Sequence, residues 1–236
     1  MGSELTFRSG LHDVLPTTFG YIGVGLAFGV VSRTRNLSLW TVLLMSLVVY
    51  AGSAQFIITS MLLAGSPISA IIFSAFLVNS RMILMSTSMA QYFKKYSLAT
   101  NIGIGSLLTD ETFALGMNKL NDTGRKLTPV WFHTANVVAY LVWAVATVAG
   151  ALIGNLITDP KTFGLDFALV AMFLGLLYLQ MVSDRSKKLS LQLSVIAFVA
   201  VAVAVYVLLI FLSANFALLG GTILGCLFGM GVTKWR

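Results

Sequence analysis

The sequence predicts an all-α, polytopic membrane protein, and its composition and the length of its apolar runs are the two observations that predict it. Of the 236 residues, 58% are hydrophobic and only 10% are charged. A soluble domain carries about 25% charged residues, so this chain has too few to coat a surface in water. The apolar runs are long enough for spanning helices and lack the alternation of barrel strands. We expect one transmembrane domain over residues 1–236.

Seven apolar runs are long enough to cross a bilayer as helices, and at least one of these helices is expected to be interrupted. The stretch 99–117 is shorter and more polar than these runs, and we expect a short buried helix or a re-entrant element there. The fold class is therefore a polytopic helical membrane protein with about seven transmembrane spans. The runs are residues 14–32, 39–64, 67–92, 130–156, 163–182, 189–212 and 214–233.

Basic residues concentrate in the loops that follow the first, third and fifth runs and precede the fourth. If residues 99–117 do not cross the membrane, all these loops share one side, which the positive-inside rule assigns to the cytoplasm. This arrangement leaves the N-terminus outside, whereas a broken or re-entrant first run would place it inside. The basic loop residues are Arg33, Arg35, Lys94, Lys95, Lys119, Arg125, Lys126, Arg185, Lys187 and Lys188.

A short internal match points to a two-fold repeat. Residues 16–20 (PTTFG) resemble residues 160–164 (PKTFG), and each segment opens an apolar run. Many transporters are built from two related halves, although a match this short also arises by chance.

Charge and composition exclude several functional classes. The formal net charge of +7 follows from the basic loops, and no basic helix face indicates nucleic-acid binding. The single cysteine, Cys226, and the two distant histidines, His12 and His133, predict no metal site. No nucleotide-binding signature is present, so we expect no cofactor and an ion gradient, most simply of protons, as the energy source.

The second run carries polar and small residues near its middle, in the segment Tyr50–Phe56. Gly52 and Ser53 can unwind a helix there, and the freed N–H groups of the following half-helix then face an anionic group such as a carboxylate. The alternative is a straight helix in which Ser53 and Gln55 hydrogen-bond a neighbour. Under the first hypothesis, Tyr50, Gly52, Ser53 and Gln55 bind substrate.

The third run contains Asn79 and Arg81 near its middle. An arginine at the centre of a spanning helix costs roughly 2.5–3.5 kcal/mol, and a purely structural helix does not require it. We therefore expect Asn79 and Arg81 to belong to a substrate or coupling site. The alternative is an ion pair that fastens two helices together.

Asp110 and Glu111 are the expected partners of Arg81. Adjacent residues on a helix point about 100° apart, so one acid is expected to pair with Arg81 while the other titrates or caps a helix. Apolar surroundings raise the pKa of a carboxyl group, which suits proton exchange. Thr109 or Asp110 alternatively caps the next helix. Asp166, early in the fifth run, is a third candidate for proton coupling, with a passive interfacial position as its alternative.

On the fourth run, Asn136 and Tyr140 lie four residues apart and share a face with Trp143. Such a polar and aromatic stripe is more typical of helix packing than of substrate binding.

Four segments resemble the AzlC family, the large subunits of two-component branched-chain amino acid exporters. The similarity covers nearly the whole chain, and the segment Tyr50–Phe56 is its most specific piece. The family usually has His after Asn-x-Arg, where this chain has Met82, and often has Pro where this chain has Gly23. The resembling segments are Gly20–Gly29, Tyr50–Phe56, Asn79–Arg81 and Leu108–Glu111.

This resemblance implies export of apolar amino acids such as valine, leucine, isoleucine or methionine. It also implies a small hydrophobic partner subunit of the AzlD type and a bacterial inner membrane. Two other classes remain open: an assembly subunit without its own substrate, and an intramembrane enzyme. The latter lacks the expected motifs, since no H-E-x-x-H and no Ser-His pair is present.

Overall fold

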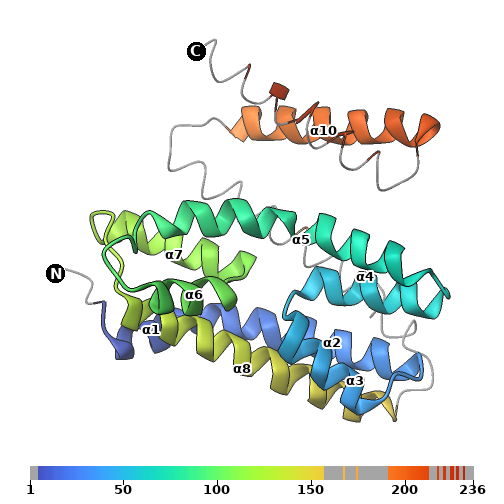
Figure 1. Ribbon diagram of the computed structural model, residues 1–236, viewed down its shortest axis with the longest axis horizontal. Helices are drawn as coiled ribbons and strands as arrows, with labels where there is room; N and C mark the ends of the chain where they lie inside the picture. Colours follow the sequence, from blue (N-terminus) through green and yellow to red (C-terminus); the bar gives the residue numbers. More distant parts are fainter. Residues whose placement is uncertain are drawn as a thin grey trace. The chain divides into compact units, whose positions relative to one another are not determined.

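The computed structural model describes residues 5–156 and 191–212, together with the isolated positions 167, 174, 217, 220, 221, 224, 225, 227, 228 and 231. The chain divides into two units, Met1–Phe173 and Leu174–Arg236. Throughout the described residues, all regular secondary structure is helical, as the composition predicts. In these residues, three helices are long and apolar enough to cross a membrane: α2 (Leu15–Thr34), α5 (Ile68–Ala90) and α8 (Pro129–Gly154) (Figure 1).

The second unit contains α10 (Leu191–Phe211), which falls in the expected run 189–212. The runs 163–182 and 214–233 lie outside the described residues apart from isolated positions. The second copy of the expected repeat, residues 160–164, also lies outside them. The spans expected at 163–182 and 214–233 and the two-fold repeat therefore stay predictions.

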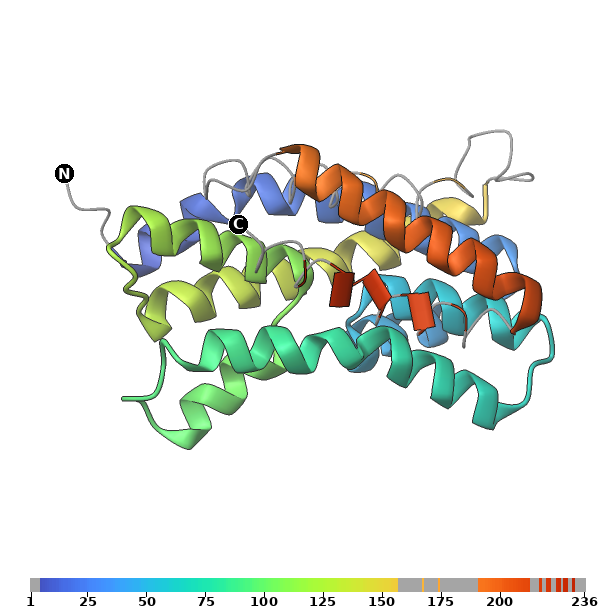
Figure 2. The ribbon, with the colours of Figure 1, turned by 90° about the horizontal axis from the view of Figure 1, so that it is seen from above.

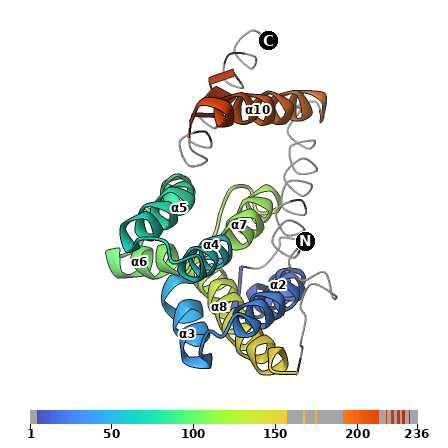
Figure 3. The same ribbon diagram turned by 90° about the vertical axis from the view of Figure 1, so that its right-hand side faces the viewer.

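In the first unit, α2 and α8 lie side by side (Figure 3), and the contacts at their two ends show that they run in the same direction. At one end, Gly10 of the preceding helix α1 (Phe7–Asp13) lies against Trp131. At the other end, the Arg33 Nε donates to Asn155 Oδ1 at 2.6 Å. Between them, Gly29 lies against the backbone of Gly150. Small residues let two backbones approach closely, which explains the glycine-rich first run without any break in α2.

Gly29→Ala is expected to destabilise the protein. A Cβ at Gly29 would lie 2.1 Å from the carbonyl oxygen of Thr147 and 2.5 Å from the amide nitrogen of Ala151, and backbone atoms cannot step aside cheaply. Overpacking of this kind costs about 1–3 kcal/mol. Thermal unfolding in detergent micelles measures the effect. Gly23→Ala is the matched control on the same helix, since nothing lies within 4 Å of its Cβ; equal melting temperatures for both variants would contradict the packing argument.

The run 39–64 forms a helical hairpin instead of one span. It contains α3 (Leu39–Leu44), a π-helix η1 (Met45–Val49) and α4 (Gly52–Leu63). The Gln55 Nε2 donates to Ser46 Oγ at 3.2 Å, and the Thr59 Oγ1 lies 3.9 Å from Met45 Sδ. Residues on either side of the break therefore face each other in antiparallel order. The chain enters and leaves this hairpin at the same end of the unit.

The tip of this hairpin is formed by Tyr50 and Ala51. Tyr50 has left-handed backbone angles (φ 41°, ψ 44°) and Ala51 is extended. The predicted interruption is confirmed, but it lies just before Gly52, which is the first residue of α4. The interruption frees backbone carbonyls, and Tyr140 supplies one partner by donating its hydroxyl to Leu47 O at 2.9 Å.

A second hairpin joins α6 (Leu98–Ser106) to α7 (Asp110–Asp122) and corresponds to the expected re-entrant element at 99–117. On α6, Ile104 accepts a hydrogen bond from Asn136 of α8 at 3.3 Å. Thr109 caps α7 through a capping box with Thr112, as the sequence predicts. α7 then returns toward the start of α8 (Figure 2).

Lys119 near the end of α7 fastens this hairpin to α1. The Lys119 Nζ donates to Asp13 Oδ2 at 2.6 Å, and the Trp131 Nε1 donates to the same oxygen at 3.0 Å. Burial alone would raise the pKa of the Asp13 carboxyl, but the hydrogen bonds from Lys119, Trp131 and His12 and the charge of Lys119 together outweigh burial and hold that pKa below its ordinary value.

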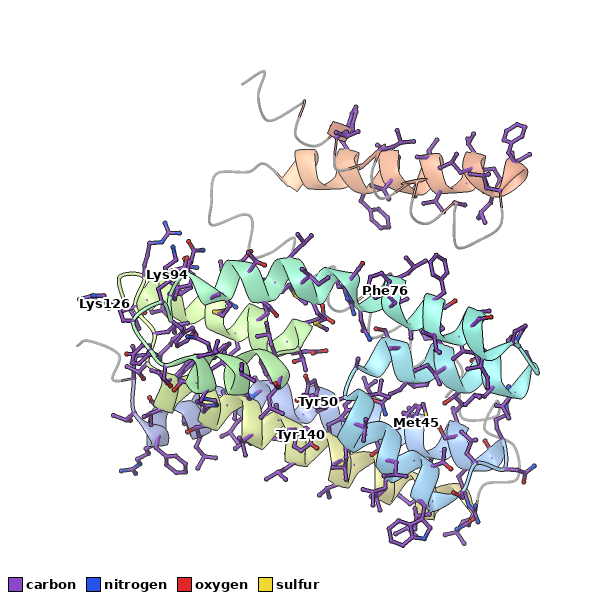
Figure 4. All side chains as sticks on the ribbon, viewed as in Figure 1. Met45, Tyr50, Phe76, Lys94, Lys126 and Tyr140 are labelled. Atoms are coloured by element: carbon purple, nitrogen blue, oxygen red, sulfur yellow. The ribbon has the colours of Figure 1, made fainter. Side chains whose placement is uncertain are left out.

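The two hairpins enter from opposite ends of the unit, so the basic loops also lie at two ends. Lys94 and Lys126 lie at the end where α8 begins (Figure 4), and the Arg125 Nη2 to Tyr92 OH distance there is 3.4 Å. Arg33 lies at the end where α8 finishes. The predicted single side for all basic loops is therefore wrong for the loop after α2, because the run 39–64 returns to its own side.

Candidate functional site

The tips of the two hairpins meet around a small cavity beside α2, α5 and α8. Its volume is about 20 Å³, room for about one or two water molecules. Six residues that the sequence predicts for the site line it, and five others join them. The predicted residues are Tyr50, Gly52, Ser53, Arg81, Asp110 and Glu111, and the others are Tyr21, Ala51, Met82, Thr109 and Trp143.

Two helices begin at this cavity. α7 starts at Asp110 and its first N–H groups are capped by Thr109, whereas α4 starts at Gly52 with no side chain capping it. The N-terminus of a helix carries partial positive charge and unpaired N–H donors, so it attracts anions. The start of α4 is therefore suited to a carboxylate, as the sequence predicts for a broken second run.

Arg81 of α5 joins the two hairpin tips. Its Nη2 lies 2.7 Å from Asp110 Oδ2 and donates to Ser53 Oγ at 3.1 Å. The side chains are 35% and 16% exposed for Arg81 and Asp110, so the ion pair borders the cavity and is not sealed in a core. The predicted partnership of Arg81 with one of the adjacent acids is confirmed as a contact, and its functional role stays a prediction.

Glu111 points to a different neighbour. The Tyr21 OH donates to Glu111 Oε2 at 2.8 Å and lies 2.5 Å from Thr109 Oγ1. Among the described residues, no basic side chain forms an ion pair with Glu111. Tyr50 adds a second phenol to this wall and packs edge-on against Tyr140 (Figure 4), with ring centroids 4.8 Å apart. The two adjacent acids thus have separate surroundings.

Two of the predicted site residues that the structure describes do not line the cavity. Gln55 is 0% exposed and lies behind the wall, where its Oε1 accepts from Trp143 Nε1 at 2.9 Å. Asn79 lies on α5 near Arg81, and its Oδ1 is buried. Asp166 lies outside the described residues.

Sequence reasoning missed Tyr21 and interpreted Trp143 as packing. The signal for Tyr21 was a single phenol within a glycine-rich run, and the glycines suggested close packing instead. Trp143 lies in the stripe with Tyr140, and it packs on Gly52 and also lines the cavity.

These features define a helical membrane protein whose polar cavity lies where two interrupted helical segments meet. The chain belongs to the AzlC family, because the family model described as AzlC protein matches residues 16–157.

Several curated relatives are similar over most of their length. Inner membrane protein YgaZ of Escherichia coli (strain K12) is 28% identical over 98% of this chain and 92% of its own. A membrane protein of Archaeoglobus fulgidus is 33% identical over 75% of this chain and 77% of its own. The branched-chain amino acid transport protein AzlC of Bacillus subtilis (strain 168) is 26% identical, over 76% and 69% respectively. No solved structure matches the chain.

Proposed function

We propose that this protein is a secondary transporter that exports apolar amino acids such as valine, leucine, isoleucine and methionine in exchange for protons. Membership of the AzlC family supports transport, and the Bacillus subtilis relative is named for branched-chain amino acid transport. The observation that carries the proposal is the Arg81–Asp110 ion pair beside the uncapped start of α4.

An amino acid is a zwitterion, and the cavity offers a partner for each charge. The substrate carboxylate would bind Arg81, the Ser53 hydroxyl and the first N–H groups of α4. The substrate ammonium would bind Asp110. An apolar side chain would then lie against Trp143 and Met82, which also line the cavity.

The cavity is too small for valine in this conformation, so binding requires that the hairpin tips move apart. Arg81 and Asp110 neutralise each other when no substrate is bound. A zwitterion inserted between them replaces one ion pair by two, which offsets the cost of separating the tips. The empty cavity is thereby kept narrow, and substrate is the ligand that opens it.

Glu111 is the proton carrier in this proposal. It has no ion-pair partner among the described residues, and Tyr21 donates to it from the cavity wall. Asp110, in contrast, is engaged by Arg81 and serves the substrate ammonium.

We place the protein in the bacterial inner membrane, which the name of the Escherichia coli relative supports. The positive-inside rule favours the cytoplasm for the end that carries Lys94, Lys95, Arg125 and Lys126, so the N-terminus is inside. A small hydrophobic subunit of the AzlD type is proposed as the partner.

A counterflow experiment tests the proposal. The protein and its partner subunit are reconstituted in liposomes loaded with unlabelled valine, and labelled valine is added outside. We expect transient accumulation of labelled valine that requires the unlabelled pool. An assembly subunit gives no exchange, and an enzyme changes the labelled compound, which chromatography of the recovered label detects. Either result overturns the proposal.

A further inference from the structure

A closed chain of buried hydrogen bonds lies directly behind the cavity wall and connects both sides of the helix break to α8. Gln55 of α4, Ser46 of η1 and Thr147 of α8 are each 0% exposed, and Trp143 is 3% exposed. The three successive donor–acceptor distances are 2.9 Å from Trp143 to Gln55, 3.2 Å from Gln55 to Ser46, and 2.8 Å from Ser46 to Thr147.

The direction of every bond in this chain follows from its two ends on α8. An indole N–H can only donate, so Gln55 must accept with its carbonyl oxygen and point its NH₂ group at Ser46. At the other end, the Thr147 hydroxyl donates to Ala144 O at 2.9 Å, so in its bond with Ser46 it accepts and the Ser46 hydroxyl donates. The chain begins and ends on α8 and leaves only one orientation for the Gln55 amide.

Trp143 is the member of the chain that reaches the cavity. Its ring lies against Gly52, where a Cβ would come within 3.0 Å of Cη2. The hydrogen bond to Gln55 therefore holds the indole at the first residue of α4, the site proposed for the substrate carboxylate. Tyr140 donates to Leu47 O from the same face of α8, so that face holds both halves of the interrupted helix.

We propose that Gln55 is a positioning residue: through Trp143 and Ser46 it fixes the shape of the cavity at the helix break and thereby sets the selectivity for the substrate side chain. This inference rests on the proposed function. Gln55 does not touch the cavity, so its effect passes through Trp143 and the hairpin. A merely structural role would lower thermal stability without changing the selectivity of the folded protein.

Gln55→Met tests the proposal, because methionine keeps the volume and removes both hydrogen bonds. We expect the dissociation constant for valine to rise about tenfold, as expected when a buried donor loses its partner. The preference for valine over alanine should decrease at the same time. The maximal counterflow rate should change less than KM. Thr59→Val is the matched control, since Thr59 lies on α4, is 3% exposed and contacts η1 outside the chain.

Two further variants keep the proposal testable if Gln55→Met does not fold. Thr147→Val removes the last hydroxyl of the chain and should shift selectivity in the same direction by a smaller factor. Gln55→Glu restores the chain when protonated, because a carboxylic acid offers the same carbonyl acceptor and a hydroxyl donor. It should approach wild-type selectivity at low pH, with wild type measured at each pH, and resemble Gln55→Met at high pH.

The outcomes separate this inference from the proposed function. If wild type neither binds nor exchanges valine, the proposed function fails. If wild type is active and the folded Gln55 and Thr147 variants keep its valine-to-alanine preference, the positioning role is refuted while the proposed function stands.

Discussion

Arg81→Met is expected to lower valine counterflow by roughly a hundredfold, the loss typical when one partner of a hydrogen-bonded, partly desolvated charge pair is removed. The substitution keeps most of the side chain's apolar length and removes the guanidinium. That group is the cationic member of the cavity, and it contacts both Asp110 and Ser53. Without it, the described residues offer a substrate carboxylate only the N–H groups of α4 and the Ser53 hydroxyl.

The single variant alone does not separate binding from folding, because it leaves Asp110 as a partly buried carboxylate without its arginine partner. Arg81→Met/Asp110→Asn removes both charges, and a pair replaced by neutral groups often costs little stability. We expect the double variant to recover the melting temperature of wild type and to remain inactive in counterflow. Recovery of both stability and transport would show that the ion pair only fastens helices together.

Arg125→Met is the matched control for the loss of an arginine. Arg125 is exposed, and its Nη2 lies 3.4 Å from Tyr92 OH at one end of the unit, far along α8 from the cavity. Counterflow by this variant should match wild type. Full transport by Arg81→Met in the same liposomes would show that Arg81 does not bind the substrate.

The polar cluster of the cavity could be predicted from the sequence because its residues are costly in a membrane. Arg81, Asp110 and the segment at Gly52 stand out within apolar runs, and the structure brings them to one place. The divergence of the adjacent acids followed from helix geometry alone. Asp110 meets Arg81, whereas Glu111 meets Tyr21.

The path of the chain around the cavity could not be predicted in the same way. Residues 39–64 are apolar throughout and long enough to span, and hydropathy does not distinguish a span from a buried hairpin of the same length. The sequence favoured Gly52 as the place of interruption. In the structure, Tyr50 adopts the left-handed conformation, which is rare for a tyrosine. Gly52 instead lies against the ring of Trp143, in a place where a side chain would leave too little room.

The place of Gln55 behind the cavity wall could not be predicted for a related reason. A polar side chain within an apolar run indicates a site, but the sequence does not tell the wall of a cavity from the layer behind it. That distinction depends on which face of α4 meets α8, and the break sets this face by the turn at Tyr50 and Ala51.

Glu111→Gln is expected to abolish the response of transport to a proton gradient while counterflow of valine persists. Glutamine keeps an oxygen that can accept from Tyr21 OH, so the cavity wall is preserved, but it cannot bind and release a proton. In liposomes with an imposed pH gradient, wild type should accumulate valine against its concentration. The variant should only equilibrate valine, because exchange of one valine for another requires no proton.

Asp122→Asn is the control for the loss of a carboxylate on the same helix, since Asp122 is exposed at the far end of α7. Its gradient response should equal that of wild type. If the Glu111→Gln protein still concentrates valine, another residue carries the coupling proton. Asp110→Asn in the same assay then shows whether that residue is Asp110. Because Asp110 pairs with Arg81 and is the proposed partner of the substrate ammonium, its loss should weaken valine binding, whereas loss of Glu111 should leave binding intact. That difference in KM separates a carboxylate that binds the substrate ammonium from one that carries the proton.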